Sequence, residues 1–272
     1  MIKAFVQEVL REDIGRGDLF ALVATPVDAS ATLTCKDTGV FAGAVYLEAL
    51  CALEGLELSL HVKDGESLVY GQKIATLRGL STTLLACERT LLNMIQHASG
   101  IATNTKKFVD ALGESPIKIL DTRKTRPCLR VFEKYAVRCG GGANHRMGLD
   151  DCLMLKDTHL KTIPDLKAFM QTARKQLPFT CKVEIECESI AQVKTAMQAG
   201  ADIIMCDNMA LETIGEVVVY RDENYPHILL EASGNITQES IKAYAKTGVD
   251  AVSSGSLIHQ ATWLDFSMKI VH

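Results

Sequence analysis

The stretch Asp202-Ile203-Ile204-Met205-Cys206-Asp207-Asn208 indicates how this chain folds, because a short apolar run ends abruptly in polar residues. A helical pattern over Ile190–Ala199 precedes it and stops at Gly200, a residue type that favours the ends of helices. A short, continuous apolar run bounded in this way is typical of a strand buried on both faces of a parallel sheet. The stretch therefore predicts one strand–helix unit of an α/β fold.

The same unit recurs through the second half of the chain. Helical patterns separate several apolar runs, and residues 240–247 form one such pattern that ends at Gly248. This repetition favours a β/α barrel over a short open sheet. No glycine fingerprint for a dinucleotide follows the first strand, which argues against a Rossmann fold. The expected strands are 117–120, 153–155, 181–185, 202–206, 228–231 and 249–252.

The first hundred residues have a different pattern, which is typical of a small α+β sandwich. The helix before Gly100 is expected to stop at that glycine. We therefore expect an N-terminal sandwich domain, residues 1–102, and a barrel domain, residues 103–272, whose last helix packs back on the first domain. The strands expected in the sandwich are 31–35, 58–62 and 71–77, and the helices are 2–10, 43–53 and 84–99.

The composition argues against several classes of protein. The 272 residues carry a formal net charge of −4, which is unfavourable for bulk binding to nucleic acid. No apolar run approaches the roughly 20 residues that span a bilayer, and the N-terminus lacks the apolar core of a signal peptide. The nine cysteines are scattered singly, which fits free thiols in a reducing compartment better than disulfides or zinc. We expect a cytoplasmic protein that binds neither membrane nor nucleic acid.

Polar residues follow the expected strands at their carboxyl ends, where barrels carry their chemistry. Arg123 and Lys124 follow the first strand, and Arg is well suited to bind a carboxylate or phosphate through two parallel hydrogen bonds. Because the whole chain is acidic, these cations indicate a site for a substrate with more than one negative charge. The other residues in this pattern are Asp121, Lys156, Asp157, His159, Glu184, Glu186, Asp207, Asn208, Ser233, Gly234, Asn235, Ser253, Ser254, Gly255 and Ser256.

Taken singly, each of these residues is also explained as a solvated loop residue, and the pattern does not decide between Glu184 and Glu186 as the functional acid. The two late loops, 232–236 and 253–257, are more informative. Each places serine and glycine between a strand and a helix, where the backbone can approach an anion. Loops after the last strands of a barrel commonly bind phosphate. Together with acids suited to Mg²⁺ or ribose hydroxyls, they predict transfer chemistry between a phosphorylated sugar and a small polycarboxylate.

An ordered set of motifs covers nearly the whole chain, and in these motifs the chain resembles the quinolinate phosphoribosyltransferase family. Together the motifs are specific, although each alone is not. They are Glu12-Asp13-Ile14-Gly15-x-Gly17-Asp18, Glu88-Arg89-Thr90-Leu91-Leu92-Asn93, Ser99-Gly100-Ile101-Ala102-Thr103, Thr122-Arg123-Lys124-Thr125, Lys134-x-Ala136-Val137, Gly140-Gly141-Gly142, His145-Arg146, Lys156-Asp157-x-His159, Val183-Glu184-Ile185-Glu186, Asp207-Asn208, Ala232-Ser233-Gly234-Asn235 and Ser254-Gly255.

The resemblance implies an enzyme that transfers phosphoribosyl from phosphoribosyl pyrophosphate to quinolinate. Decarboxylation accompanies the transfer, and the products are nicotinate mononucleotide, pyrophosphate and CO₂, in the biosynthesis of NAD. It implies an irregular β/α barrel with fewer than eight strands behind the sandwich domain. The sandwich domain would form a homodimer, or a larger assembly such as a hexamer, and Mg²⁺ would be the cofactor.

The resemblance also implies a role for each matching residue. Quinolinate would be bound by Arg123, His145, Arg146 and Lys156, with Arg89 supplied by the partner subunit. The catalytic residues around the ribose and pyrophosphate would be Lys124, Glu186 and Asp207. Glu186, favoured over Glu184 by the motif, and Asp207 would also hold Mg²⁺, directly or through water. The phosphate would be bound by Ser233, Gly234, Asn235, Ser254 and Gly255.

Several alternatives stay open at this point. Without the motifs, Arg89 is explained as a surface residue of an amphipathic helix and His145 as a core histidine. Arg126 and Cys128 stand where the family pattern leads us to expect small or neutral residues, so Arg126 would add a cation near the pocket. The competing functions are a transferase for nicotinate or another aromatic acid, a divergent paralogue linked to metal uptake, and a non-catalytic sensor. Residues 62–77 are also similar to half of a biotinyl or lipoyl carrier hairpin, but they lack a lysine at a tight turn flanked by small residues or methionine.

Overall fold

The computed structural model describes residues 1–271, so His272, the last residue of the expected barrel domain, lies outside the described residues. The chain divides into two compact units, each built from more than one segment. The first unit contains residues 1–106, residues 135–141 and the C-terminal segment from Ala261. The remaining residues form the second unit. This division differs from the single cut expected after residue 102, because the chain returns to the first unit twice.

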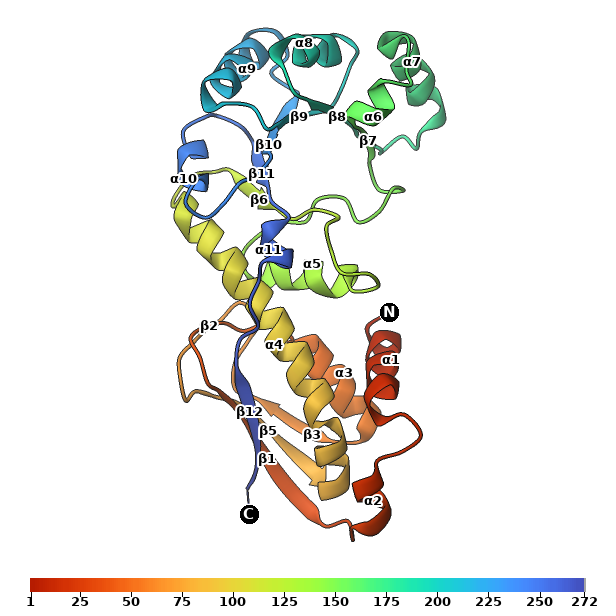
Figure 1. Cartoon of the computed structure of the whole chain (residues 1–272), viewed down its shortest axis with the longest axis vertical. Helices are drawn as coiled ribbons and strands as arrows, with labels where there is room; N and C mark the ends of the chain where they lie inside the picture. Colours follow the sequence, from red (N-terminus) through yellow and green to blue (C-terminus); the bar gives the residue numbers. More distant parts are fainter. Residues whose placement is uncertain (272) are drawn as a thin grey trace. The chain divides into compact units, whose positions relative to one another are not determined.

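A four-stranded antiparallel sheet is the centre of the first unit, with the strand order β12-β1-β5-β3 (Figure 1). A two-stranded sheet of β2 and β4 accompanies it, and helices α1 and α3 pack against each other. The elements are α1 (Ile2–Ile14), α2 (Leu19–Val23), β1 (Asp28–Cys35), β2 (Gly39–Val40), α3 (Ala44–Glu54), β3 (Glu57–Leu60), β4 (Ser67–Leu68), β5 (Lys73–Leu80) and β12 (Phe266–Val271).

Strand β12 corrects one expectation, because the last element of the chain is a strand and not a helix. Phe266 and Met268 are buried while the residues between and after them are more exposed, and this alternation is the period of a half-buried strand. The strand pairs with β1 in antiparallel register, from Ser30 opposite Val271 to Cys35 opposite Phe266. The C-terminal segment therefore completes the sheet of the first unit by backbone hydrogen bonds.

Six parallel strands form the sheet of the second unit, in the order β6-β11-β10-β9-β8-β7. The expected α/β fold with fewer than eight barrel strands is confirmed, and every expected strand is present with bounds that agree to within two residues. The strands are β6 (Lys118–Leu120), β7 (Leu153–Leu155), β8 (Val183–Cys187), β9 (Ile203–Asp207), β10 (Leu229–Ser233) and β11 (Ala251–Ser253).

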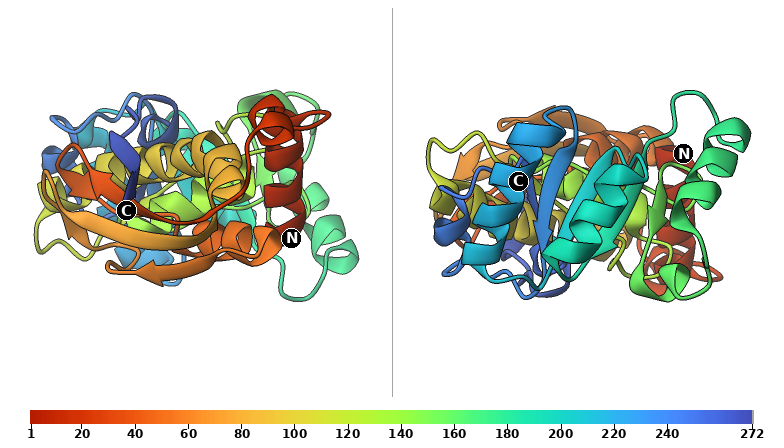
Figure 2. Two further views of the ribbon diagram at one scale, coloured as in Figure 1. Left: turned by 90° about the horizontal axis from the view of Figure 1, so that it is seen from below. Right: turned by 90° about the horizontal axis from the view of Figure 1, so that it is seen from above.

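Helices connect these strands in the manner of β/α units. Helix α8 packs on β8 and β9 and also beside α9, as the views of Figure 2 show. In the described residues, no helix combines the length and the apolar character that a membrane-spanning segment needs. The helices after the first unit's α3 are α4 (Ser81–Leu112), α5 (Arg130–Cys139), α6 (Asp157–Leu160), α7 (Leu166–Gln176), α8 (Ile190–Gln198), α9 (Leu211–Asn224), α10 (Ile241–Tyr244) and α11 (Ser256–His259).

Helix α4 does not stop at Gly100, contrary to the expectation from sequence, but continues to Leu112. Gly100 serves a different purpose within this helix. A Cβ atom at this position would lie 2.2 Å from the backbone oxygen of Thr262 and 3.0 Å from Cα of Trp263. The glycine is therefore required because the backbone of the C-terminal segment passes directly over the helix, and no side chain fits between them.

Two helical glycines give a direct test of this explanation. Gly100→Ala is expected to destabilise the protein by about 1–3 kcal/mol, because the added Cβ meets backbone atoms that cannot turn aside. Gly215→Ala in α9 is the matched control, since nothing lies within 4 Å of a Cβ there. It is expected to stabilise by about 0.4–1 kcal/mol through helix propensity. Chemical denaturation measures both, and equal effects of the two changes would contradict the close-approach explanation.

Candidate active site

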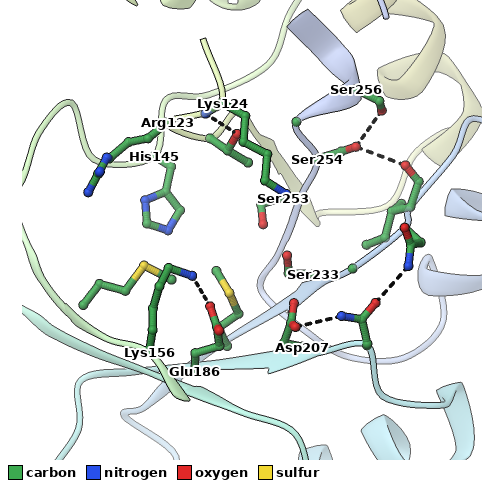
Figure 3. A pocket seen from close by; sticks show the side chains of 18 of the residues that line it. Arg123, Lys124, His145, Lys156, Glu186, Asp207, Ser233, Ser253, Ser254 and Ser256 are labelled. Atoms are coloured by element: carbon green, nitrogen blue, oxygen red, sulfur yellow. Dashed lines mark hydrogen bonds and ion pairs between the residues drawn. The ribbon is translucent and has the colours of Figure 1, made fainter. Parts of the chain in front are cut away.

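A pocket of about 810 Å³ opens at the carboxyl ends of the parallel strands, and all of its lining residues belong to the second unit (Figure 3). This volume is within the usual range for small-molecule sites. The lining residues are Thr122, Arg123, Lys124, His145, Arg146, Leu149, Met154, Lys156, His159, Glu186, Met205, Asp207, Asn208, Ser233, Gly234, Asn235, Ile236, Thr237, Ser253, Ser254, Gly255, Ser256, His259 and Gln260.

A buried network below the pocket holds the cationic loops in place. Asp121 follows β6, and its Oδ1 accepts hydrogen bonds from Nζ of Lys134, at 2.5 Å, and from the backbone N–H of His145, at 2.9 Å. Nζ of Lys134 also donates to the backbone oxygens of His145 and Arg146, at 2.6 and 3.0 Å. Asn144 donates from Nδ2 to the second carboxylate oxygen of Asp121. One carboxylate and one ammonium group thus tie β6, α5 and the loop 144–146 together.

Neither member of this pair has contact with water, since the side chain of Lys134 is 1% exposed and that of Asp121 is 0% exposed. Burial raises the pKa of the Asp121 carboxyl, whereas the hydrogen bonds from Lys134, Asn144 and His145 act in the opposite direction. Burial likewise lowers the pKa of the Lys134 amine, and the contacts with Asp121 oppose that change. Each group is therefore tolerated in the interior only while the other is present.

The cations of the pocket differ in how firmly they are held. Arg123 and Lys124 are exposed, whereas Arg146 is half-buried and donates from Nη1 to the backbone oxygen of Cys152, at 2.9 Å. Burial lowers the pKa of the Arg146 guanidinium, and the nearby charge of Arg123 adds to this effect. Two guanidinium groups that repel each other in one pocket form a favourable site for a ligand with two negative charges.

Lys156 and Glu186 form an ion pair inside the pocket, from the loop after β7 to β8 (Figure 3). The side chain of Lys156 is 43% exposed and that of Glu186 is 11% exposed, so the pair lies at the boundary with solvent. An anionic ligand that binds Lys156 competes with Glu186 for the ammonium group. Lys156 is expected to bind one substrate, and Glu186 is expected to act on the other. The ion pair therefore links the binding of the first substrate to the availability of the Glu186 carboxylate.

His145 lies between the cations and the core. Its Nε2 is 3.1 Å from Oε2 of Glu184 and 3.3 Å from Oε2 of Glu231, and both carboxylates are buried. Burial by itself would lower the pKa of His145, whereas hydrogen bonding with Glu184 and then with Glu231 acts in the opposite direction and raises it. For Glu231, burial raises the pKa of the carboxyl. A second ring proton, on Nδ1, is opposed by the backbone N–H of Arg146, which donates to that nitrogen at 2.7 Å.

The other end of the pocket is lined by small polar residues. Asp207, at the end of β9, accepts a hydrogen bond of 2.8 Å from Nδ2 of Asn208, and Asn235 donates to Oδ1 of Asn208 at 3.2 Å. Asn208 and Asn235 have positive φ angles of 52° and 49°. Gly234 has φ of 105°, and a Cβ there would lie 2.3 Å from Oδ1 of Asn208. The glycine thus lets the loops after β9 and β10 touch.

The loop after β11 is similarly close to a functional side chain. A Cβ at Gly255 would lie 2.9 Å from Cδ of Lys124, so the glycine leaves room for the lysine to extend along the loop. The Ser254 hydroxyl donates to the backbone oxygen of Ile236 at 3.0 Å and shares a hydrogen bond of 2.7 Å with Ser256. The two small-residue loops are therefore joined to each other, and Lys124 lies against one of them.

The comparisons with known proteins agree with this arrangement. The model of the quinolinate phosphoribosyl transferase C-terminal domain matches residues 101–269, and the model of its N-terminal domain matches residues 18–99. The chain belongs to this family.

Relatives match over nearly the full length. A probable nicotinate-nucleotide pyrophosphorylase (carboxylating) of Bacillus subtilis is 41% identical over 99% of this chain and 93% of its own length. A probable nicotinate-nucleotide pyrophosphorylase (carboxylating) of Synechocystis is 38% identical over 100% of this chain and 93% of its own length. The crystal structure of NadC from Streptococcus pyogenes has a TM-score of 0.93 at 41% identity, covering 99% of this chain and 96% of its own. The nicotinate-nucleotide pyrophosphorylase structure from Francisella tularensis has a TM-score of 0.90 at 34% identity, covering 99% and 96%.

Most of the expected site residues of this family member come together in one pocket. The exception is Arg89, which belongs to the first unit, is exposed on α4 and does not line the pocket. Its contribution from a partner subunit stays a prediction. Sequence reasoning missed Glu231, which sits in the apolar strand β10. The available signal was the presence of a carboxylate within that strand, because a buried acid needs a partner.

The two departures from the family pattern have structural outcomes. Arg126 does not line the pocket; its Nη1 donates to Oε1 of the buried Glu133 at 2.7 Å, so its charge is paired. The expectation of an added cation near the pocket is therefore corrected. Cys128 has φ of 63°, which explains why a glycine is expected there, since a side chain is strained in this region.

The buried ion pair below the pocket can be tested by removing first one and then both of its charges. Lys134→Met is expected to destabilise the protein by about 3–5 kcal/mol, because the Asp121 carboxylate would remain buried without its partner. Lys134→Met combined with Asp121→Asn is expected to be less destabilised than Lys134→Met alone, since no unpaired charge stays in the interior. Urea denaturation measures both variants. A double variant at least as unstable as the single one would show that the unpaired carboxylate is not the cause of the instability.

Proposed function

We propose that this chain catalyses the transfer of phosphoribosyl from phosphoribosyl pyrophosphate to quinolinate, with decarboxylation, in the biosynthesis of NAD. The observation that supports it is the order of side chains across the pocket (Figure 3). Arg123, His145 and Lys156 lie at one side of the pocket. The two small-residue loops, which include Ser254, lie at the other side. Lys124, Glu186 and Asp207 lie between the two sides. A dicarboxylate and a phosphorylated sugar would therefore meet next to catalytic side chains.

The reaction follows from this order. The pyridine nitrogen forms a bond to C1 of the ribose while the bond from C1 to pyrophosphate breaks, through a state with positive charge on the sugar. Carboxylates of Glu186 and Asp207 stabilise that charge, and Lys124 offsets the charge of the leaving group. The nitrogen of the product ring is then positive and accepts the electron pair released as the 2-carboxylate leaves as CO₂. A proton takes the place of that carboxylate on the ring.

The positively charged side of the pocket orients the ring. Arg123 and Arg146 would each hold a carboxylate through paired hydrogen bonds, and Lys156 would add a third contact once it leaves Glu186. The same movement would free the Glu186 carboxylate toward the ribose. The binding of quinolinate would thus determine, through this one ion pair, whether the Glu186 carboxylate is free to act at the ribose.

The donors present fit a role for Mg²⁺. Glu186 and Asp207 both line the pocket, and Mg²⁺ in nucleotide enzymes commonly binds through one or two carboxylates together with substrate oxygens. When bound, the ion would supply charge neutralisation for the pyrophosphate. We further propose that the enzyme acts in the cytoplasm as a homodimer or a larger assembly, with Arg89 of one subunit completing the site of the other. The exposure of Arg89 on α4 supports this, because the side chain is available to a partner.

The substrate is tested by an assay of the purified protein with phosphoribosyl pyrophosphate, Mg²⁺ and either quinolinate or nicotinate. Nicotinate mononucleotide and CO₂ are expected in equal amounts from quinolinate and no product from nicotinate, because a monocarboxylate leaves some of the pocket cations unpaired. Product from nicotinate without CO₂ would retain the transferase but change its substrate. A folded protein inactive with both acids would favour the paralogue or the non-catalytic sensor.

The shared site is tested by mixing two inactive variants, Arg89→Ala and Arg123→Ala. After subunit exchange, about a quarter of the normal activity is expected, because half of the dimers are hybrids and each hybrid has one intact site. Arg123→Ala mixed with Lys156→Ala is the matched control. Both residues serve the same subunit's site, so no intact site forms and no activity is expected. Absence of recovery in the first mixture, with exchange verified by mass, would show that Arg89 is not supplied across the interface.

A further inference from the structure

Two buried acids behind His145 have no part in the chemistry described so far. Glu184 comes from β8 and Glu231 from β10, and neither side chain lines the pocket. Both carboxylates are directed at the same atom, Nε2 of His145. The side chain of His145 is 12% exposed, while those of Glu184 and Glu231 are 0% and 4% exposed. The histidine thus stands between two interior acids and the substrate pocket.

Both ring nitrogens of His145 are engaged by the protein. The backbone N–H of Arg146 donates to Nδ1 at 2.7 Å, which requires a lone pair on that nitrogen. The ring proton therefore lies on Nε2, where it faces the two carboxylates. Because one hydrogen bond acts on each edge of the ring, the ring can neither flip nor rotate without losing contacts on both sides.

The arrangement is costly for folding. Oε2 of Glu184 and Oε1 of Glu231 are buried, and neither accepts a hydrogen bond within the described part of the chain, although the Glu184 atom is close to Nε2. Arg146 and Cys152 also lie near Glu184, and Cys206 lies near Glu231. Two buried carboxyl groups that share one N–H are unfavourable compared with a pair of apolar side chains. A fold optimised for stability alone would not retain both acids.

We propose that Glu184 and Glu231 are positioning residues that fix the ring of His145 for quinolinate binding without touching the substrate. The inference rests on the proposed function. It also changes the role expected for His145: the ring acts as a fixed wall of the dicarboxylate pocket, with its nitrogens turned to the protein. The carboxylates of quinolinate are then bound by Arg123, Arg146 and Lys156.

The first measurement needs no activity. ¹⁵N NMR of the imidazole of His145, assigned by comparison with His145→Gln, reports which nitrogen carries the proton and whether the ring is fixed. In the unmodified protein we expect a proton on Nε2 and a lone pair on Nδ1, both without and with quinolinate. In the variant with Glu184→Ala and Glu231→Ala the N–H of Arg146 still favours a lone pair on Nδ1, so we expect the same tautomer. The Nε2 proton loses both carboxylates, and we therefore expect a mobile ring with broadened signals and rapid exchange of this proton with water. Ring signals that stay sharp in that variant, with an Nε2 proton that exchanges as slowly as in the unmodified protein, would overturn the proposal, whatever the enzyme's substrate is.

The second measurement separates positioning from a structural role. Glu184→Ala and Glu231→Ala are expected to raise KM for quinolinate about tenfold, with KM for phosphoribosyl pyrophosphate changed less than about twofold. Glu184→Gln and Glu231→Gln keep an acceptor oxygen, so KM is expected to remain near normal. Because each Gln replaces one of two neighbouring buried acids by a neutral amide, each single Gln variant is expected to have a Tm a few degrees higher than the unmodified protein.

Glu133→Gln is the matched control, since Glu133 is also a buried acid but pairs with Arg126 outside the pocket. It is expected to lower Tm with no selective change in KM for quinolinate. Equal increases of both KM values in the Ala variants, or a lower Tm in the Gln variants of Glu184 and Glu231, would assign these acids a structural role and overturn the proposal. If the unmodified enzyme does not use quinolinate, the proposed function fails, and the NMR result still decides the positioning role.

Discussion

Asp121 and Lys134 meet in the interior of the second unit, where neither side chain has contact with water. The three hydrogen-bond donors of the ammonium group are all used: one by Asp121 and two by the backbone oxygens of His145 and Arg146. This contact determines where the loop 144–146 lies relative to the end of β6. Because Arg123 and Lys124 follow β6 and Arg146 ends the loop, the spacing of the pocket's cations depends on this single buried pair.

A second constraint is the balance of charge around the pocket. Arg123, Lys124, Arg146 and Lys156 bring four positive charges to one cavity, in a chain with a net charge of −4. The structure places acids near these cations: Glu186 pairs with Lys156, and the carboxyl group of Glu184 acts on Arg146. Because these acids offset the positive charge of the cations, the pocket is stable before the substrate binds. Carboxylates of the proposed substrate can then replace the acids as partners of the cations. Preorganised charge of this kind is the main resource by which enzymes stabilise charged transition states.

The differences between expectation and structure have physical causes that act between separate segments of the chain. Gly100 matched the local pattern of a helix end. A glycine is needed there, however, because the backbone of Thr262 and Trp263 lies across α4. The final segment was expected as a helix, yet its alternation suits a strand, and the free edge of β1 provides its partner. Arg126 was expected to add charge to the pocket, but the buried Glu133 of helix α5 takes it up. In each case the partner belongs to another segment, so the local pattern does not reveal it.

The sequence by itself determined the class of fold, the six parallel strands and most of the residues that line the pocket. It did so because strand burial and polar strand ends are local patterns, and because the motifs run in order along the chain. Only the tertiary structure decided how those residues are paired. Glu184 and Glu186 look alike in sequence, two residues apart on one strand, yet one contacts His145 and the other Lys156. Glu231 reaches His145 only because β10 pairs with β9 in the folded sheet. Hydrogen bonds and ion pairs depend on distances of about 3 Å in space, and such distances are set by packing and not by spacing along the chain.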